Sequence, residues 1–333
     1  MRKLRVVQIG TEHDHAADAM RQMKSMPEVF DIAGFVRVEE KDTFFKKHPA
    51  DYENVRELTL SEALADPTIE AAIIETEDCF LTEYAFLAAK HGWHVEMDKP
   101  GSQDHEAFVA LSDYCEAHGL VFHLGYMYRY NPAFQKILKL KNDGTLGRIL
   151  SVYAEMSCYH AEPKRKWLAG YKGGMTYFLG CHLIDAVLQL MGEPDEVIPM
   201  NSRSNPDYGE DIGLAILRYN GIPSTIKTLA AEAGGFIRRE IVVVGEKGTA
   251  EIKPIEYYPF GDGRMQTDLY VSIVGEGGEK FHYTPEKETF PPYYRLETML
   301  YEFAACCTGE QKNPYSYDYE KKVHEILLKA SGA

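Results

Sequence analysis

The stretch Trp93–Pro100, WHVEMDKP, decides the fold. Its strand-like run Val95–Met97 ends abruptly at Asp98-Lys99-Pro100, because a proline lacks the amide N–H that would continue a strand. In an open α/β sheet, ligands bind just outside the carboxyl ends of the strands. We therefore expect Lys99 to point its ammonium into that crevice, with Asp98 beside it to hold it in place. The plainer interpretation is an ordinary strand end whose lysine is solvated.

The residues around this stretch alternate between strand-like and helix-like runs. The expected strands cover residues 4–9, 32–36, 69–74, 95–97 and 120–124, and the helices between them lie near 16–23, 63–64, 82–90 and 108–115. Thr82 is placed to cap the third of these helices. Strands that alternate with helices at this spacing indicate an α/β fold with a parallel, doubly wound sheet, which we assign to a first domain, residues 1–125.

The second half of the chain lacks that alternation. Strand-like runs at 149–156, 212–219, 224–231, 239–244 and 249–253 follow one another with few long helices between them. This succession is typical of an open, mainly antiparallel sheet in an α+β domain. Further helices are expected at 131–141 and near 296–303 and 323–327. We assign a second domain to residues 126–333, whose last helix can pack back on the first domain.

Composition limits the classes of partner. The 333 residues carry 36 basic and 51 acidic side chains, a net charge of −15 that disfavours nucleic acids and anionic membranes. Hydrophobic residues make up 45% of the chain, enough for real cores, and no run is long enough to span a bilayer. The N-terminal MRKLRVVQIG turns directly into a strand, unlike a signal peptide. Six cysteines without a CxxC pair favour reduced thiols and a cytoplasmic location.

The turn after the first strand, Gly10–His15, lies where a dinucleotide-binding fingerprint G-x-G-x-x-G would begin. Only the first glycine is present, and Glu12 takes the second position, where its charge and bulk oppose a pyrophosphate. His13 or His15 can still meet a phosphate at the start of the following helix. Two other interpretations are a plain polar helix start and a metal site made of the two histidines and nearby carboxylates. Because two histidines and scattered acids rarely suffice for a metal site, we expect none.

The end of the second strand bears on the choice of nucleotide. An acidic residue there hydrogen-bonds a ribose 2′-hydroxyl and selects NAD, whereas an arginine suits the 2′-phosphate of NADP. Arg37 falls nearest to that position, and Glu39 or Glu40 would serve NAD if the register shifts by about two residues. The choice between NAD and NADP stays open.

A second stretch with candidate functional residues is Gly173–Asp185, GGMTYFLGCHLID. Two glycines open it, and Gly180-Cys181-His182 then begins an apolar helix. A histidine in the first turn of a helix lies at the positive end of the helix dipole, which favours the neutral imidazole that a general base requires. The other interpretation is a histidine buried between the sheet and the helix.

Taken in order, several motifs resemble those of the glucose–fructose oxidoreductase / inositol dehydrogenase / MocA (Gfo/Idh/MocA) family. They are Asp98-Lys99-Pro100, Arg129-Tyr130-Asn131-Pro132, Gly173-Gly174 and Gly180–Asp185, and the resemblance covers essentially the whole chain. It implies an N-terminal Rossmann domain that binds NAD or NADP, and a C-terminal domain whose open sheet commonly forms the interface of a homo-oligomer, a dimer or tetramer. It also implies that Lys99 and His182 are the catalytic lysine and histidine.

Further site residues follow from the turn, the strand ends and the matched motifs. The residues expected at the cofactor are Gly10, Thr11, Glu12, His13, His15, Arg37, Thr76, Asp98, Lys99, Pro100 and Arg129. The residues expected at a carbohydrate-like substrate are Tyr126, Tyr159, His160, Trp167, Tyr177, Phe178 and Asp185. Aromatic faces suit the C–H groups of sugars, although these aromatic residues can equally belong to the core.

Three positions depart from the family's pattern. Phe178 stands where the family has a catalytic Asp, and Glu12 replaces a glycine of the turn. Thr76-Glu77, followed by Leu81, stands where the family has Thr/Asn-Pro and then a His. The loss of a carboxylate at position 178 removes a group that would orient the substrate hydroxyl. The residues that can replace it are Tyr177, His160 and Tyr126.

These features predict an NAD(P)-dependent oxidoreductase that transfers a hydride between a nicotinamide and a sugar, sugar derivative or cyclitol. His182 would take the hydroxyl proton, and Lys99 would hydrogen-bond the developing oxyanion. One alternative is a redox-neutral, nucleotide-dependent enzyme that processes glycosides. The other is a catalytically silent ligand sensor on the same fold, which the replaced Asp and glycines motivate and which Lys99 and His182 oppose.

Overall fold

The computed structural model describes residues 1–38, 48–275 and 284–333. The chain forms two compact units, and most of its backbone contacts lie within one unit or the other. The first unit combines Met1–Tyr126 with Leu296–His324, and the second combines Met127–Arg295 with Glu325–Ala333. The first unit therefore takes in a late segment of the chain in addition to the expected residues 1–125.

Side chains of that late segment explain why it joins the first unit. The ring of His324 stacks on Phe108 with ring centres 4.1 Å apart, and its Nε2 lies 2.8 Å from the carbonyl oxygen of Ser102. The ring of Phe303 lies against His123 with ring centres 5.9 Å apart. All four of these rings are fully buried, so the segment contributes to the core of the first unit.

The first unit contains a parallel sheet of five described strands in the order β2-β1-β3-β4-β5. The strands are β1 (Leu4–Ile9), β2 (Phe30–Val36), β3 (Ala71–Ile74), β4 (His94–Met97) and β5 (Phe122–Leu124). The helices are α1 (Ala16–Lys24), α2 (Leu60–Ala65), α3 (Leu81–Lys90), α4 (His105–Ala117), α9 (Glu297–Cys307) and the first part of α10 (Tyr317–Ser331). All strand pairs are parallel, which confirms the predicted doubly wound, Rossmann-type fold.

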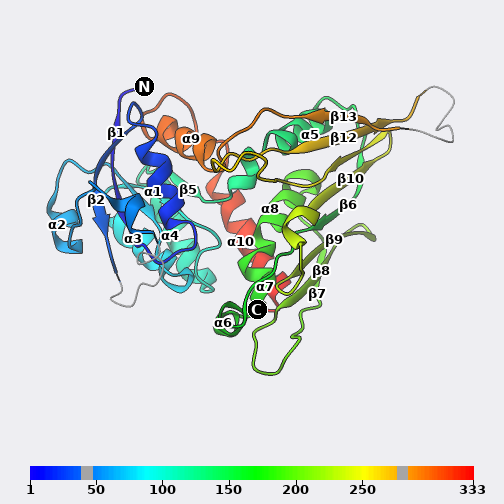
Figure 1. Ribbon diagram of the computed structural model, residues 1–333, viewed down its shortest axis with the longest axis horizontal. Helices are drawn as coiled ribbons and strands as arrows, with labels where there is room; N and C mark the ends of the chain where they lie inside the picture. The colour runs from blue at the N-terminus through cyan, green and yellow to red at the C-terminus, as the bar shows by residue number, and fades with distance from the viewer. Residues whose placement is uncertain (39–47, 276–283) are drawn as a thin grey trace. The chain divides into compact units, whose positions relative to one another are not determined.

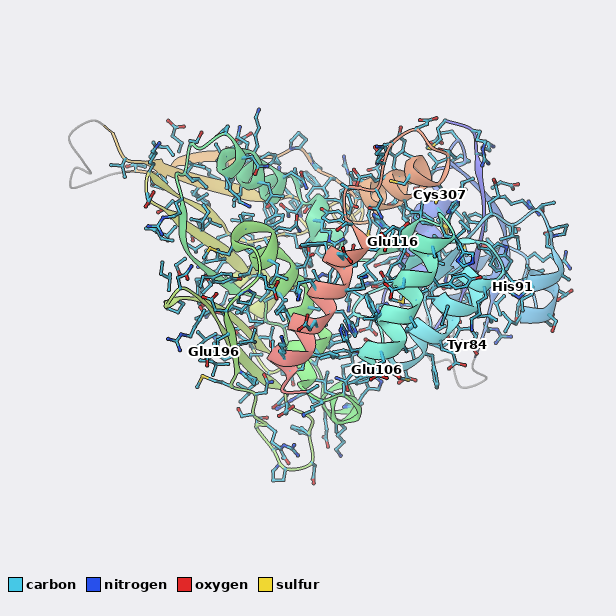
Figure 2. The ribbon with its side chains drawn as sticks, turned by 180° about the vertical axis from the view of Figure 1, so that it is seen from behind. Tyr84, His91, Glu106, Glu116, Glu196 and Cys307 are labelled. Carbon is cyan, nitrogen blue, oxygen red and sulfur yellow. The ribbon has the colours of Figure 1, made fainter. Side chains whose placement is uncertain are left out.

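The sequence of each element fits its place in this unit. Every residue of β3 is buried, as a parallel strand covered on both faces requires. Helix α4 buries Phe108 and Cys115 on one face. It carries Glu106 and Glu116 near its opposite ends, on the exposed side (Figure 2). Because one face of the helix is apolar and the opposite face is polar, the helix packs its apolar face against the sheet.

The predicted helix cap at Thr82 is wrong. Helix α3 begins at Leu81, and its N-cap residue is Phe80, which makes no side-chain cap hydrogen bond. The buried hydroxyl of Thr82 instead accepts the backbone N–H of Ser102 at 3.0 Å. Thr82 therefore ties the start of α3 to the segment that follows β4.

The second unit is built on a sheet of eight described strands in the order β13-β12-β11-β10-β6-β9-β8-β7. The strands are β6 (Ile149–Glu155), β7 (Glu196–Pro199), β8 (Ile212–Tyr219), β9 (Ile222–Leu229), β10 (Glu240–Gly245), β11 (Gly248–Ile252), β12 (Asp268–Ile273) and β13 (Glu286–Thr289). The β6–β9 pair is parallel and the other pairs are antiparallel, which confirms the predicted mainly antiparallel sheet.

Helices cover one face of this sheet. The helices of the unit are α5 (Pro132–Asn142), α6 (Glu162–Trp167), α7 (Gly174–Phe178), α8 (Gly180–Met191) and the last part of α10. Helices α5, α7 and α8 lie on the same side of the strands (Figure 1). Strand β8 accordingly buries Ala215 and Leu217, whereas Leu214 and Ile216, which point to the other face, are partly exposed.

Three strands of this sheet, β7, β12 and β13, were not predicted. Strand β13 has the sequence EKET, and all four of its residues are exposed. Strand β7, at the opposite edge, buries none of its residues fully. Edge strands without an apolar alternation carry little sequence signal, because neighbouring strands supply their hydrogen bonds whatever the side chains are.

None of the described helices combines the length and apolar character needed to cross a bilayer. The longest described helix, α10, has 15 residues and several charged side chains.

Candidate functional site

The β1–α1 turn starts at Gly10, the residue at which a dinucleotide fingerprint would begin. Gly10 has a φ of +95°, and a Cβ at this position would lie 2.4 Å from the backbone nitrogen of Thr76. The turn therefore packs directly on the end of β3, an approach that requires a glycine. The backbone N–H groups of Glu12 and His13 then donate to the carbonyl of Glu75, at 3.2 and 3.0 Å.

The side chain of Glu12 occupies the anion position of this turn. Its Oε2 accepts the Thr11 backbone N–H at 2.7 Å, and its Oε1 accepts the Val38 backbone N–H at 3.2 Å. These two amides form an anion-binding pair beyond the ends of β1 and β2, and the anion that they hold is the chain's own carboxylate. A phosphate or a ribose hydroxyl of a dinucleotide could accept from the same two donors if the Glu12 side chain turned away.

The residues expected to distinguish NAD from NADP lie beside Val38 in the sequence. Arg37 donates from Nε and Nη2 to Oε1 of Glu57, at 2.8 and 2.6 Å, on the surface of the unit. Glu39 and Glu40 lie outside the described residues. Thr76 is buried, and its hydroxyl donates to the carbonyl of Glu77 at 3.3 Å.

Three side chains converge behind the turn. His13 and His15 come from the turn itself, and Asp98 follows β4. Asp98 Oδ2 lies 2.8 Å from His15 Nδ1 and 3.1 Å from His13 Nδ1. Burial opposes the charged forms, but the attraction between the rings and the carboxylate outweighs it. The pKa of His13 is therefore held well above its usual range and that of Asp98 well below it. Burial lowers the pKa of His15.

Two more buried carboxyl groups adjoin this cluster, and the sequence analysis missed both. Glu75 Oε2 lies 3.4 Å from His13 Nδ1. Burial and the charge of Asp98 raise the pKa of Glu75 to about 8. Burial, followed by the charge of Glu75, raises the pKa of Glu96 well above its usual range. The available signal was a carboxylate in or directly after an apolar strand, a position that acidic residues rarely take unless they have partners.

Lys99 is buried at the carboxyl end of β4. It is 1% exposed, so the interpretation of a solvated lysine is wrong. The peptide bond between Lys99 and Pro100 is cis. The backbone N–H of Lys99 donates to Asp98 Oδ1 at 2.6 Å, which holds one oxygen of that carboxylate while the other faces the histidines.

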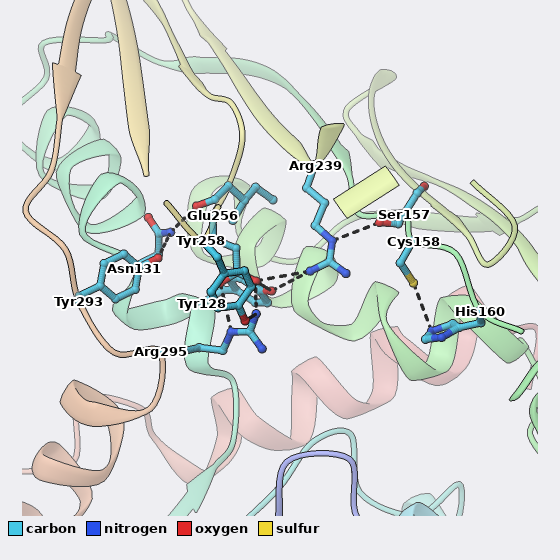
Figure 3. A network of polar contacts seen from close by, with 11 residues as sticks. Tyr128, Asn131, Ser157, Cys158, His160, Arg239, Glu256, Tyr258, Tyr293 and Arg295 are labelled. Atoms are coloured by element: carbon cyan, nitrogen blue, oxygen red, sulfur yellow. Dashed lines mark hydrogen bonds and ion pairs between the residues drawn. The ribbon is translucent and has the colours of Figure 1, made fainter. Parts of the chain in front are cut away.

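In the second unit, His182 lies near the start of α8 and is buried, at the position that the sequence predicts. Tyr128 meets the imidazole edge-on, with ring centres 4.8 Å apart and planes at 84°. The Tyr128 hydroxyl donates to the fully buried Glu256 carboxylate, which also accepts from Arg295 Nη2 at 2.5 Å (Figure 3). Arg239 Nη1 donates to the Tyr128 hydroxyl at 3.0 Å. A network from distant segments thus fixes the ring that orients His182, and no local sequence signal marks it.

Phe178, which stands where the family has an Asp, belongs to an aromatic cluster. Trp167 meets it edge-on with ring centres 5.5 Å apart, and His160 lies with its ring centre 6.0 Å away. Lys164 Nζ lies 4.2 Å from the ring centre of Phe178 and 3.6 Å from that of Trp167. The structure thus brings together three of the predicted substrate residues. Tyr159 is 66% exposed and lies apart from these ring contacts.

Two other predicted site residues, Arg129 and Asp185, pair with each other. Arg129 Nε lies 3.1 Å from both carboxylate oxygens, and its Nη2 lies 2.7 Å from Oδ1. Both side chains are buried. The pair links the turn that carries Tyr128 to the helix that carries His182. Of the remaining predicted residues, Tyr177 stacks on Tyr171, and Tyr126 is buried at the end of the first unit.

Comparison with known proteins adds to this geometry. Residues 134–251 match the family model described as the GFO/IDH/MocA C-terminal domain. The chain is 30% identical over 154 residues to a scyllo-inositol 2-dehydrogenase (NADP(+)) of Bacillus subtilis (strain 168), an alignment that covers 46% of this chain and 42% of the relative. It is 25% identical over 219 residues to a 2,7-anhydro-N-acetylneuraminate hydratase of Escherichia coli (strain K12), covering 61% and 59%. The matched part thus spans about half the length of these two curated relatives.

A solved structure shares the fold over nearly the whole chain. It is a 3-ketoreductase from Actinomadura kijaniata in complex with TDP-benzene and NADP, with a TM-score of 0.78 and 16% identity. The likeness covers 98% of this chain and 96% of that one. The family's domain model, its dehydrogenase relatives and the motifs from Asp98 to Asp185 agree, and residues 134–251 of this chain form a C-terminal domain of the GFO/IDH/MocA type.

Proposed function

We propose that this protein is an NAD(P)-dependent oxidoreductase that transfers a hydride between a nicotinamide and a hydroxyl or ketone carbon of a sugar, sugar derivative or cyclitol. The observation that carries the proposal is the buried His182, whose ring is oriented by Tyr128 at the family's catalytic position. The buried Lys99 at the family's other catalytic position supports it. The names of a dehydrogenase and a ketoreductase relative support the substrate class.

The residues of the chain act on protons and on charge. The dinucleotide, when bound, supplies the site that accepts or donates the hydride. His182 takes the substrate's hydroxyl proton on an imidazole nitrogen during oxidation and returns it during reduction. The Lys99 ammonium donates a hydrogen bond to the oxyanion that develops on the substrate oxygen. Tyr128 keeps the imidazole in one orientation, because its own hydroxyl is held by Glu256.

In this proposal the first unit holds the dinucleotide and the second unit holds the substrate. Gly10 and the backbone N–H groups of Thr11 and Val38 would hold the dinucleotide after Glu12 turns away. His160 and Trp167, around Phe178, would contact the substrate.

Formation of reduced nucleotide tests the proposal. The full chain is incubated with NAD⁺ or NADP⁺ and with cyclitols, aldoses or nucleotide sugars, and the absorbance of reduced nicotinamide is followed. We expect net reduction with at least one of these classes and none with the His182→Ala variant. If the wild-type chain binds nucleotide but reduces none with any class, it is not a dehydrogenase of these compounds.

A second candidate is a redox-neutral reaction on a glycoside. The hydratase relative favours it, and so does Phe178, which lacks the carboxylate that the family uses at this position. In such a cycle a bound dinucleotide would take up a hydride from the substrate and return it within one turnover, so that its net oxidation state would not change. A new carbohydrate product, detected by mass spectrometry without net reduced nucleotide, would distinguish this candidate from a dehydrogenase.

We also propose a homo-oligomer joined through the sheet of the second unit. The helices cover one face, and the other face carries partly exposed apolar side chains such as Leu214, Ile216 and Val242. Burial of these side chains against a second copy would remove apolar surface from water. A monomer in light scattering at micromolar concentration would contradict it.

A further inference from the structure

The buried cluster of His13, His15 and Asp98 has the donor set of a metal centre. We propose that these three residues bind one divalent transition-metal ion, for which Zn²⁺ is the best match, with Glu75 beside the ion. Each of the three residues offers one donor atom, and the three atoms lie within 4.8 Å of one another. The proposal does not depend on the proposed oxidoreductase activity.

The distances between the donor atoms suit a tetrahedral ion. Zinc binds histidine nitrogen and carboxylate oxygen at about 2.0–2.2 Å, so donor atoms around a tetrahedral zinc lie roughly 3.3 Å apart. Asp98 Oδ2 lies 2.8 Å from His15 Nδ1 and 3.1 Å from His13 Nδ1. The two histidine donor atoms lie within 4.8 Å of each other, and rotation of the rings would bring all three donor atoms to one ion.

The surroundings hold the donor atoms on one side. The Lys99 backbone N–H binds Asp98 Oδ1, which leaves Oδ2 for the histidines. The His13 ring makes its polar contacts through Nδ1, with Asp98, with Glu75 and with the His15 backbone N–H at 3.3 Å. Its Nε2 has no hydrogen-bond partner among the described residues. The ring is thus oriented by the cluster alone.

Unpartnered carboxylate oxygens supply a second, independent observation. Glu75 Oε2 points toward His13 Nδ1 from 3.4 Å, yet neither it nor either oxygen of Glu96 makes a hydrogen bond within the described part of the chain. Both side chains are buried, at 2% and 1% exposure. A buried carboxyl oxygen without a hydrogen-bond partner is costly whether or not the group carries a proton, and a divalent ion next to Asp98 would give the Glu75 oxygen a partner.

The donor types select the class of ion. Two imidazoles and one carboxylate suit Zn²⁺ and other first-row transition metals, whereas Ca²⁺ and Mg²⁺ prefer sets made of oxygen atoms. The ion would not contact the Thr11 and Val38 backbone N–H groups. These two groups donate to Glu12 on another part of the turn. A metal ion and the phosphates of a dinucleotide therefore use different atoms.

Equilibrium dialysis of the full chain against ZnCl₂, after removal of metal with a chelator, tests the proposal. Bound zinc is measured by elemental analysis, and Ca²⁺ is dialysed in parallel. We expect one Zn²⁺ per chain and no Ca²⁺. His13→Gln, His15→Gln and Asp98→Asn should each weaken zinc binding by at least about tenfold, since even residues that only support metal ligands typically contribute 10–100-fold.

A matched control and a folding check make the result decisive. His48→Gln removes an exposed histidine whose Nδ1 lies 3.8 Å from Asp51, and this variant should bind zinc like the wild type. Circular dichroism of the metal-free variants shows whether they fold. If the wild-type chain binds no zinc at millimolar concentration, the site holds protons only and the proposal fails, whatever the variants do. It also fails if the folded His13→Gln/His15→Gln double variant keeps wild-type affinity.

Discussion

Glu12 Oε2 accepts the backbone N–H of Thr11 at 2.7 Å, so a carboxylate of the chain itself fills a position where nucleotide-binding turns hold phosphate. The other oxygen of Glu12 reaches the Val38 backbone N–H beyond β2, at 3.2 Å. A dinucleotide that uses these donors must first displace the carboxylate. For a dinucleotide bound at this turn, the departure from the three-glycine fingerprint would mean competition between Glu12 and the nucleotide.

Replacing Glu12 should relieve that competition. A hydrogen bond to a charged group contributes about 1.5–3 kcal/mol, and about 1.4 kcal/mol corresponds to a tenfold change in affinity. We therefore expect Glu12→Gly to bind NADH or NADPH about tenfold more tightly, measured by titration of nicotinamide fluorescence. Glu12→Gln, which keeps the size and removes the charge, should gain less. Unchanged affinity for both nucleotides would show that the turn is not the phosphate site.

The proposed catalytic residues should affect turnover more than binding. Loss of a positioned general base typically removes about 10²–10⁴ of the rate. We expect His182→Ala and Lys99→Met each to lower kcat by that order, while nucleotide affinity survives. Steady-state kinetics with a working substrate, together with the fluorescence titration, measures both quantities. Full activity in the His182→Ala variant would remove the proposed mechanism and leave the fold unaffected.

The buried pair Arg129–Asp185 should be needed for stability. Removing one partner of a buried ion pair leaves an uncompensated charge and typically costs about 3–5 kcal/mol. We expect Asp185→Asn to lower the midpoint of urea unfolding sharply, and Arg129→Met/Asp185→Leu to recover part of the loss. The exposed pair Arg148–Glu246 is the control, and Glu246→Gln should leave the midpoint nearly unchanged. A loss no larger than that of the control would contradict this prediction.

His324 should make the chain less stable in acid. Burial lowers the pKa of His324 to about 4 in the folded chain, from 6.5 when it is unperturbed. Between these two values the unfolded chain binds a proton that the folded chain does not. This contribution is therefore fully present above about pH 6.5 and is lost as the pH falls toward about 4, by on the order of 3 kcal/mol. The free energy of unfolding in urea, measured across that pH range, should depend less on pH for His324→Gln than for the wild type. An equal dependence in both proteins would show that His324 is not its cause.

The fold could be predicted from the sequence because its signals are local. The run Val95–Met97 is followed by Asp98-Lys99-Pro100, which ends the strand. Strands that alternate with helices in this way predict a parallel sheet, even where the exact boundaries of the elements are shifted. The fully exposed edge strand β13 has no apolar alternation, so the same reasoning missed it. Helix caps are harder to predict, as Thr82 shows. Its hydroxyl could have accepted a backbone N–H of its own helix, but it accepts the N–H of Ser102, a residue distant in the sequence.

The candidate sites were harder to predict, because they depend on which distant side chains turn toward each other. His15 and Asp98 are separated by 83 residues and still lie 2.8 Å apart. The topology of a parallel sheet brings their strand ends together, but nothing local shows that the carboxylate faces the histidines. Arg129 and Asp185 illustrate the same limit, since their motifs suggested a cofactor role and a substrate role and their side chains bind each other.

An oxidoreductase that works with a nicotinamide dinucleotide must bind one, and direct binding can be measured without a known substrate. Purified full chain is titrated with NADH and with NADPH, and the fluorescence of bound nicotinamide is followed to saturation. We expect saturable binding of at least one of them, at one site per chain, and tighter binding by Glu12→Gly. Absence of saturable binding of both nucleotides, in the wild type and in Glu12→Gly alike, would contradict it.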